Sequence, residues 1–440
     1  MKQHIRIGCG AGFSGDRLEP ALILVKQGQL DYLVLECLAE RTIALAQKRK
    51  RQDPTLGYDP LLERRIESLL PHLVEKKVRL ITNMGAANPL AAAQKVIDIA
   101  RRLNLSVTVA AVTGDDVFSL LSENETALET GKPLMDSGTL VSANAYLGTD
   151  AILPALATGA DIIITGRVAD PSLFVSPLVH EFGWSLEDSN QIGQGTVIGH
   201  LLECAGQLTG GYFADPGRKD VPDMAHLGHP FADVSSDGTA VFGKVAGTGG
   251  MLTVATAKEQ LLYEVMDPSR YITPDVVADF SQVRLEETGL DQVKAIGGRG
   301  ETRPDTLKVS VGYEAGFIGE GEISYAGANA LGRAKLAGSI IQERLQDRFT
   351  DLRLDYIGST SVHRTNFGHY PDPYEIRLRV AGRATTAQHA ALVGEEVEAL
   401  YTNGPAGGGG ARKYIHEVVG IVSTLMDRNK ITSSITVLES

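Results

Sequence analysis

Short apolar runs alternate with amphipathic stretches along the first half of the chain. The apolar runs are continuous rather than alternating, which is typical of strands covered on both faces. The predicted strands are Ile5–Ile7, Tyr32–Leu35, Val78–Ile81, Val107–Ala111 and Asp161–Thr165. The predicted helices between them are Pro20–Lys26, Ala39–Lys50, Leu61–Lys76 and Pro89–Leu103. This rhythm predicts an α/β fold, with a mostly parallel sheet flanked by helices in the N-terminal part.

The periodicity changes after the last of these strands. A long helical pattern covers Ile192–Leu208, whereas residues 209–250 are rich in Gly, Pro, Asp and His and indicate a long loop region. We therefore place a domain boundary near residue 250. It separates an α/β domain over 1–250 from a second α/β or α+β unit over 251–440.

The second part of the chain mixes hairpin and helical patterns. In Leu307–Tyr325, an alternating segment, a glycine-bearing turn and a second alternating segment predict a β-hairpin. The stretch Arg412–Met426 predicts a last helix. Between them the pattern predicts helices over Gly327–Leu345 and Thr386–Tyr401 and strands over Leu352–Ile357 and Glu375–Val380.

Composition narrows the classes of function. The 440 residues contain 42 Lys and Arg against 54 Asp and Glu, a net charge of −12. This balance argues against nucleic acid as a partner, because phosphate binding needs a clustered cationic surface. No apolar run has the length of a membrane span, the N-terminus lacks the apolar core of a signal peptide, and the three cysteines are too scattered for a disulfide framework. We expect a cytoplasmic enzyme that forms a homo-oligomer.

The first strand runs directly into a glycine-rich segment. A glycine-rich turn between a strand and a helix lets backbone N–H groups surround a phosphate at the helix N-terminus. The polar pair Asp16 and Arg17 stands where a dinucleotide loop would use backbone alone, which argues against a Rossmann-type cofactor site. A tight turn without a ligand is the alternative. The substrate-binding candidates here are Gly10, Gly12, Ser14, Asp16 and Arg17.

A second glycine-rich segment, Asn403–Arg412, contains four successive glycines before the predicted last helix. A structural turn needs one or two glycines, so four indicate a closely lying anionic or acyl ligand, and an arginine at the helix start could pair with its phosphate or carboxylate. A flexible hinge is the alternative. The candidates here are Gly407, Gly408, Gly409 and Arg412.

Polar residues recur where the predicted parallel strands end, which is the edge at which open α/β sheets bind ligands. We interpret Arg167 as an anion clamp and Asp170 as a candidate base after the strand at Asp161–Thr165. Asp170 and Asn88 are also natural helix N-caps, but the convergence of several loops predicts a pocket. The further candidate ligands are Asn83, Asn88 and Asn144.

One predicted helix carries His200, Glu203 and Cys204 on a single face, at spacings i, i+3 and i+4. This face predicts an acid–base pair, a thiol with a polarising neighbour, or a set of metal ligands. We favour acid–base work by His200 and Glu203, since a lone Cys on an apolar helix is usually a buried small hydrophobe. The pair His226 and His229 has a spacing that suits zinc or iron, but no third ligand follows at a diagnostic distance, and a plain loop is favoured.

Six segments together resemble the acyclic terpene utilisation AtuA family. They are IRIGCGAGFSGDR, ITNMGAANP, GADIIITGRVADPS, GHLLECAGQLTGG, ISYAG and NGPAGGGGAR, and they run from the first strand to the last glycine loop. The resemblance implies a part in the bacterial breakdown of acyclic terpenoids through acyl-CoA intermediates. Some members carry a further C-terminal ferredoxin-like domain, which this chain is expected to lack. A small separate ferredoxin-like subunit is therefore the predicted partner.

The resemblance and the polar residues together predict a lyase or hydratase that acts on a carboxylic acid or an acyl-CoA thioester. The arginines and glycine loops would bind anionic groups, and Asp170, His200 or Glu203 would move the proton. A CoA thioester is the expected substrate moiety, a divalent metal is a further candidate, and no redox cofactor is required. Two alternatives stay open: a non-catalytic or partner-dependent subunit of an acyl-CoA-processing complex, and a nucleotide-dependent ligase or transferase. The second is weakened because neither glycine loop ends in the Gly-Lys-Ser/Thr of a P-loop.

Overall fold

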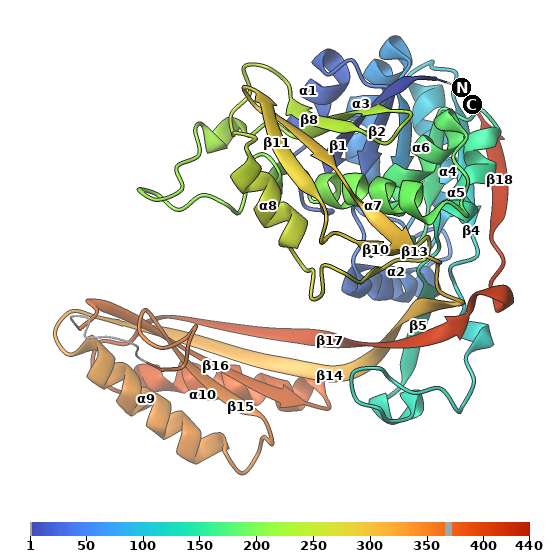
Figure 1. Ribbon diagram of the computed structural model, residues 1–440. Coiled ribbons are helices and arrows are strands. Elements are labelled where there is room, and N and C mark those ends of the chain that lie inside the picture. The colour runs from blue at the N-terminus through green and yellow to red at the C-terminus, as the bar shows by residue number, and fades with distance from the viewer. Residues whose placement is uncertain (1, 366–371) are drawn as a thin grey trace. The chain divides into compact units, whose positions relative to one another are not determined.

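A computed structural model describes residues 2–365 and 372–440 of the chain (Figure 1). The chain folds into two compact units, one made of Met1–Gly312 with Ile421–Ser440 and the other of Tyr313–Gly420. The boundary expected near residue 250 falls inside the first unit. The physical reason is strand pairing across that point, because β12 (Gln292–Ile296) completes the same sheet as β8 (Ala240–Lys244).

The first unit is built on a sheet whose central strands run parallel. In the described residues this sheet has ten strands in the order β11-β12-β8-β7-β1-β2-β3-β6-β4-β18. The five predicted strands are confirmed, with shifted ends, as β1 (His4–Ala11), β2 (Tyr32–Leu35), β3 (Arg79–Thr82), β4 (Thr108–Thr113) and β6 (Ile162–Thr165). These five pair in parallel and confirm the α/β class.

Antiparallel strands extend the sheet on both sides. Beyond β1 lie β7 (Pro230–Ser235), β8, β12 and β11 (Arg284–Gly289), and beyond β4 lies β18 (Ser434–Glu439). The prediction of a long loop over residues 209–250 is therefore wrong for β7 and β8. Pairing with β1, distant in sequence, makes β7 a strand, and such pairing leaves little local signal.

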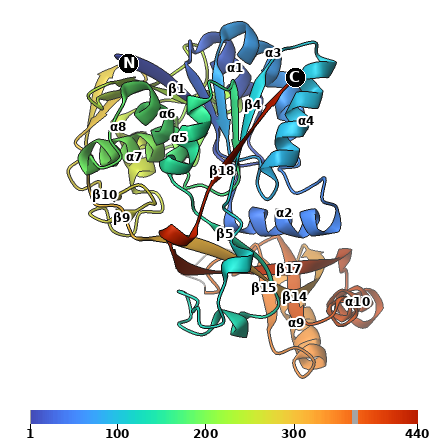
Figure 2. The same cartoon turned by 90° about the vertical axis from the view of Figure 1, so that its right-hand side faces the viewer.

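Helices cover both faces of this sheet. The four predicted helices are confirmed as α1 (Glu19–Gln27), α2 (Glu40–Gln52), α3 (Leu62–Lys76) and α4 (Pro89–Arg102). Figure 2 shows α1, α3 and α4 on one side of the strands and α6 and α7 on the other. The further helices are α5 (Thr149–Ala157), α6 (Ser172–Phe182), α7 (Ser189–Glu203) and α8 (Val254–Leu262). The remaining strands of this unit are β5 (Leu140–Ala145), β9 (Tyr271–Ile272), β10 (Val277–Asp279) and β13 (Arg299–Glu301).

The second unit has the order βαββαβ. Its elements are β14 (Thr306–Ala326), α9 (Ala330–Leu345), β15 (Leu352–Ile357), β16 (Glu375–Ala384), α10 (Ala387–Asn403) and β17 (Gly409–Asp427), of which β14 and β17 each begin or end in the first unit. The sheet order is β15-β16-β14-β17. This order is the ferredoxin-like arrangement. Both predicted helices and both predicted strands of this region are confirmed.

Two other predictions for this region are wrong. The expected hairpin over Leu307–Tyr325 is one continuous strand, β14, which pairs with β16 from Phe317 to Ala326. Its glycines serve packing instead of a turn, because a Cβ at Gly319 would lie 1.7 Å from the carbonyl oxygen of Ala390 in α10. The expected helix over Arg412–Met426 is strand β17, whose run of β-branched residues suits a strand.

The ferredoxin-like order bears on the predicted partner. Residues 313–420 of this chain themselves have the topology that was predicted for a separate subunit. A separate ferredoxin-like subunit stays a prediction that no observation here tests.

Candidate functional site

A cavity of about 660 Å³ opens in the first unit at the carboxyl ends of β1, β2 and β6. This is the edge at which open α/β sheets bind ligands. The loop after β1, the loop after β2, the loop after β6 and the C-terminal end of α7 all contribute to it. Of the predicted residues, the cavity is lined by Gly12, Ser14, Asp16, Arg17, Arg167, Asp170 and Glu203.

The loop after β1 uses its own carboxylate in place of a phosphate. The backbone N–H groups of Gly12 and Arg17 donate to Asp16 at 3.0 and 2.9 Å, so the donors expected to surround a phosphate are already occupied. The buried Arg65 donates to the carbonyl oxygens of Ser14 and Asp16 at 2.9 and 2.6 Å. These two hydrogen bonds hold the loop in place. The backbone N–H groups of Gly12 and Arg17 are therefore not available to a phosphate.

The glycines of this loop serve close packing. A Cβ at Gly12 would lie 2.6–2.9 Å from the backbone of Cys204, so the missing side chain lets the loop reach the end of α7. A Cβ at Gly10 would lie 2.8 Å from Leu35 and 2.9 Å from Ala21, which makes Gly10 a packing residue behind the cavity. Gly12 thus brings together two walls of the site that are far apart in sequence.

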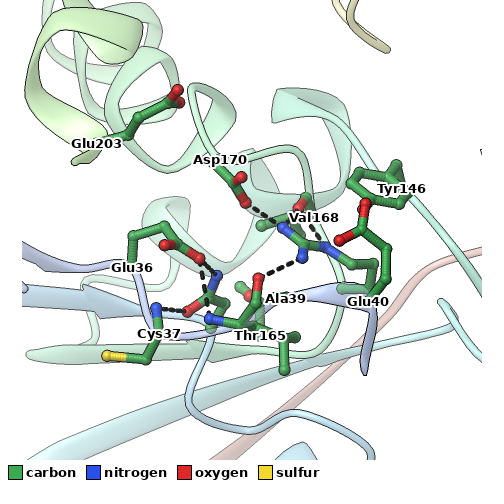
Figure 3. A network of polar contacts seen from close by, with 12 residues as sticks. Glu36, Cys37, Ala39, Glu40, Tyr146, Thr165, Val168, Asp170 and Glu203 are labelled. Atoms are coloured by element: carbon green, nitrogen blue, oxygen red, sulfur yellow. Dashed lines mark hydrogen bonds and ion pairs between the residues drawn. The ribbon is translucent and has the colours of Figure 1, made fainter. Parts of the chain in front are cut away.

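Arg167 is turned into the protein and does not offer itself as an anion clamp. Its guanidinium donates to the carbonyl oxygens of Leu38 and Val168 and to the carboxylate of Asp170 (Figure 3). It stacks over the ring of Tyr146 at 4.4 Å and is only 1 % exposed. Burial lowers its pKa, but Asp170, Tyr146, Glu36 and Glu40 together raise it by more, and the group stays cationic. Arg167 therefore orders the loops and compensates the charge of Asp170.

Three carboxyl groups that line the cavity, those of Glu36, Asp170 and Glu203, have raised pKa values (Figure 3). Burial raises the pKa of Glu36 well above its usual value, and the charge of Asp170 adds to that rise. Burial also raises the pKa of Asp170, although Arg167 works in the opposite direction. Burial raises the pKa of Glu203 to about 7, with Asp170 again contributing. Carboxyl groups with separated pKa values in one cavity are suited to proton transfer.

The carboxyl group of Glu203 contacts the buried imidazole of His200. Its Oε1 lies 2.9 Å from Nδ1 of His200, whereas its Oε2 is buried without a hydrogen-bond partner. His200 is 1 % exposed, packs on Tyr271 and Phe280, and has its Nε2 3.2 Å from the carbonyl oxygen of Leu261. The acid–base role of His200 stays a prediction, but His200 does not line the cavity, and it contacts the cavity residue Glu203.

The geometry allows one proton to be shared between these two side chains. A carbonyl oxygen only accepts, so Nε2 of His200 must carry a hydrogen. A neutral His200 then accepts at Nδ1 from a protonated Glu203, whereas a cationic His200 donates to the Glu203 carboxylate. In both states Oε2 makes no hydrogen bond to the protein.

The thiols of the cavity are not activated. Cys37 and Cys204 line it, but burial raises the pKa of both. A thiolate needs a lowered pKa. A covalent role for Cys204 is not supported.

Asn83 supports the site without lining it. It is buried, accepts the N–H of Cys37 at 2.7 Å and donates to Glu36 at 2.9 Å. It thereby orients Glu36, which lines the cavity.

Asn88 and Asn144 have structural contacts. Asn88 caps α4 and donates to the carbonyl oxygens of Pro54 and Leu56. Asn144 is buried and donates to Asp115 at 2.8 Å, and Asp115 accepts the backbone N–H of Arg167. Neither asparagine lines the cavity.

The second glycine segment lies in the other unit. Gly409 and Arg412 belong to β17, so no helix follows the loop and no helix N-terminus is available for an anion. A Cβ at Gly408 would lie 3.0 Å from Ile323 and 3.2 Å from Tyr325, and Gly407 has φ +73°. The structure places Gly407, Gly408, Gly409 and Arg412 outside the residues that line the cavity.

Sequence reasoning missed several residues of the cavity. Glu40 accepts from Tyr146 and pairs with Lys308, and although burial opposes ionisation, these contacts lower its pKa to about 2. Only the position of Glu36, directly after β2, could have indicated it from sequence. The others depend on contacts distant in sequence. The cavity residues outside the predicted site include Glu36, Glu40, Tyr146 and His229, of which His229 was considered from sequence only as a metal ligand with His226.

The structure separates the two histidines that suggested a metal. His226 is exposed and contacts Asp223 at 2.8 Å, whereas His229 is buried and contacts Gly10. Within residues 2–365 and 372–440, no three His, Cys, Asp or Glu side chains are placed to hold a metal ion together. Over the same residues, no helix has the length and apolar character needed to cross a membrane.

Comparison with known proteins places the whole of this fold and site in one family. The profile described as "Acyclic terpene utilisation family protein AtuA" matches residues 5–437. Neither the curated proteins nor the solved structures contain a significant match. The match spans both units and every residue of the cavity, so the chain belongs to the acyclic terpene utilisation AtuA family.

Proposed function

We propose that this protein is a hydro-lyase that adds water to, or removes it from, an unsaturated acyl thioester in terpene utilisation. The observation that carries the proposal is Glu203, which lines the cavity, has a buried Oε2 without a hydrogen-bond partner, and has a pKa raised by burial to about 7. Such a group is close to half protonated at neutral pH. It can therefore donate a proton in one direction and accept one in the other.

The charge of the cavity favours a thioester over a free acid. Its described lining has six carboxyl groups against two guanidinium groups, and Arg167 already has an ion-pair partner. A free carboxylate would be repelled by those carboxyl groups that are ionised, such as Glu40, whose pKa is lowered to about 2. A thioester carbonyl is uncharged, and the phosphates of its carrier need not enter. The carboxyl-bearing residues are Asp16, Glu36, Glu40, Asp170, Glu203 and Glu264.

The reaction needs two proton positions. In hydration, the oxygen of water bonds to the β-carbon and the electron pair of the double bond moves toward the α-carbon. Protonated Glu203 gives its proton to that carbon. In dehydration, ionised Glu203 takes the proton back. The proton that water loses needs a second acceptor in the same cavity.

The test is turnover of branched α,β-unsaturated acyl-CoA thioesters, followed by loss of the thioester-conjugated absorbance. We expect turnover by the wild-type protein and none with the corresponding free acids. Glu203→Gln should lower kcat by about 10²–10⁴-fold with little change in binding. Glu67→Gln is the matched control, because Glu67 on α3 pairs with Arg102 of α4 outside the cavity, and this variant should keep full activity.

Two results would count against the proposal. Turnover that survives Glu203→Gln would exclude the assigned proton donor. A wild-type protein that binds neither thioesters nor free acids in a thermal-shift screen would favour the alternative of a partner-dependent subunit. A bound ligand at 100 times its Kd should add about 2.7 kcal/mol of stability, which such a screen detects.

A further inference from the structure

We propose that His229, with Asp16 beside it, is the second proton-transfer centre of this cavity and the acceptor of the proton that water loses. The inference rests on the proposed function and names the group that it leaves open. Both residues line the cavity. Neither the family match nor the spacing of His226 and His229 assigns this role to His229.

The fold brings His229 to the site through strand pairing. His229 directly precedes β7, and Phe231 of β7 lies opposite Gly8 of β1. Antiparallel register then places residue 229 opposite Gly10, and its Nδ1 lies 3.2 Å from the Gly10 carbonyl oxygen. A carbonyl oxygen only accepts, so Nδ1 carries the hydrogen. In the neutral ring, Nε2 therefore presents a lone pair.

The Nε2 side of the ring borders a carboxylate and a glycine. Nε2 lies 3.8 Å from Oδ1 of Asp16, which is too far for a hydrogen bond but close enough to stabilise a charged ring. A Cβ at Gly206 would lie 3.5 Å from Nε2, so a side chain there would narrow the approach to the nitrogen. Both Asp16 and Gly206 line the cavity with His229. Nε2 thus lies among residues that line the cavity in which a substrate would bind.

Burial is the main reason why the ring of His229 favours its neutral form. Burial lowers the pKa of His229, Arg65 and Arg17 lower it further, and Asp16 and the Gly10 carbonyl raise it. The position of the Asp16 carboxylate is fixed, because its two oxygens accept hydrogen bonds from the backbone N–H groups of Gly12 and Arg17. A neutral base beside a fixed carboxylate is the arrangement that favours accepting a proton in the transition state.

The two centres complete one balanced reaction. Nε2 of His229 takes a proton from water as the water oxygen bonds to the β-carbon, and Glu203 gives a proton to the α-carbon. His229 ends with one proton more and Glu203 with one fewer, and exchange with solvent restores both. The segment from Glu203 to Gly206 joins the two centres, since it carries the donor at one end and borders the His229 ring at the other.

The test variant is His229→Asn. Its side-chain amide can still donate to the Gly10 carbonyl, as Nδ1–H does, but it has no basic nitrogen. We expect kcat to fall by about 10²–10⁴-fold, with the Kd for the thioester within about threefold and an unchanged circular dichroism spectrum. His226→Asn is the matched control, because His226 is exposed and outside the cavity lining, and it should keep full activity.

A second measurement does not depend on turnover. In the ¹⁵N NMR spectrum of the wild-type protein, the ring of His229 should appear as the neutral Nδ1–H tautomer at pH 7. Asp16→Asn should lower the pKa of that ring, because Asp16 raises it. A protonated ring at pH 7, or an Nε2–H tautomer, overturns the proposal.

The outcomes separate this inference from the proposed function. Turnover that survives His229→Asn but not Glu203→Gln overturns the role of His229 and leaves the proposed function standing. Absence of turnover by the wild-type protein contradicts the proposed function and, with it, the role of His229 in hydration. Loss of turnover in both variants, with binding retained, supports both.

Discussion

Glu203 and His200 are joined through one oxygen and one nitrogen, Oε1 and Nδ1, at 2.9 Å, and the second carboxylate oxygen of Glu203 is left without a partner. The pair lies at the end of α7, where the chain turns away because Ala205 adopts φ +44°. The predicted helix over Ile192–Leu208 therefore ends five residues early. This early end places Glu203 at the cavity instead of inside a longer helix.

Replacing His200 should move the pH dependence of activity upward. The charge of His200 and its hydrogen bond lower the pKa of Glu203 against the larger effect of burial, so removing both should raise that pKa above about 7. His200→Phe keeps the ring packing on Tyr271 and Phe280 but has no ring nitrogen. We expect the limb of the pH–rate profile that belongs to Glu203 to shift to higher pH. An unchanged limb in His200→Phe, compared with Tyr271→Phe as control, would show that His200 does not act on Glu203.

Replacing Tyr146 should reduce stability above about pH 4.5. Although burial opposes it, the hydrogen bond from Tyr146 helps to lower the pKa of Glu40 to about 2. A lowered carboxyl pKa gives stability that is present above the unfolded value and is lost as pH falls toward the folded value. Tyr146→Phe should therefore cost about 1–2 kcal/mol in the free energy of unfolding at pH 7. The cost should shrink toward pH 2, as measured by urea unfolding, and an equal cost at both pH values contradicts the assignment.

Replacing Arg167 by lysine should destabilise the protein. Lysine lacks the planar fork that reaches the carbonyl oxygens of Leu38 and Val168 as well as Asp170. One buried acceptor is then left unpaired, and we expect a loss of about 1–3 kcal/mol in urea unfolding. Arg17→Lys is the control, since Arg17 is exposed and should tolerate the change. Equal stability of the two variants would mean that the buried contacts of Arg167 contribute little.

Adding a methyl group at Gly12 should disturb the cavity. The new Cβ would lie 2.6–2.9 Å from the backbone of Cys204, which cannot move as a flexible side chain would. We expect Gly12→Ala to cost about 1–3 kcal/mol and to abolish turnover, because the loop and the end of α7 must separate. Gly409→Ala is the matched control, as its Cβ would meet no atom within 4 Å. Full activity in Gly12→Ala would contradict the assigned packing role.

The hydrophobic pattern by itself determined the α/β core and much of the second unit. Strands such as β2 and helices such as α4 carry their own signal, because burial on both faces or on one stripe repeats along a few neighbouring residues. The same pattern failed for β7, β14 and β17. These segments are strands because they pair with strands far away in the sequence, or because their glycines allow a helix to pack closely against them. Such contacts leave no periodic pattern of hydrophobic residues in the segment itself.

For the candidate site too, some residues could be predicted from the sequence and others only from the tertiary structure. Position after a parallel strand was enough to predict Asp16 and Asp170 as cavity residues, because the carboxyl ends of such strands share one edge. Only the tertiary structure decided that Arg167 points inward, that His200 stands behind Glu203, and that His229 joins the cavity. Direction of a side chain and pairing of distant strands are set by packing in three dimensions, and neither is encoded in residue type or spacing alone.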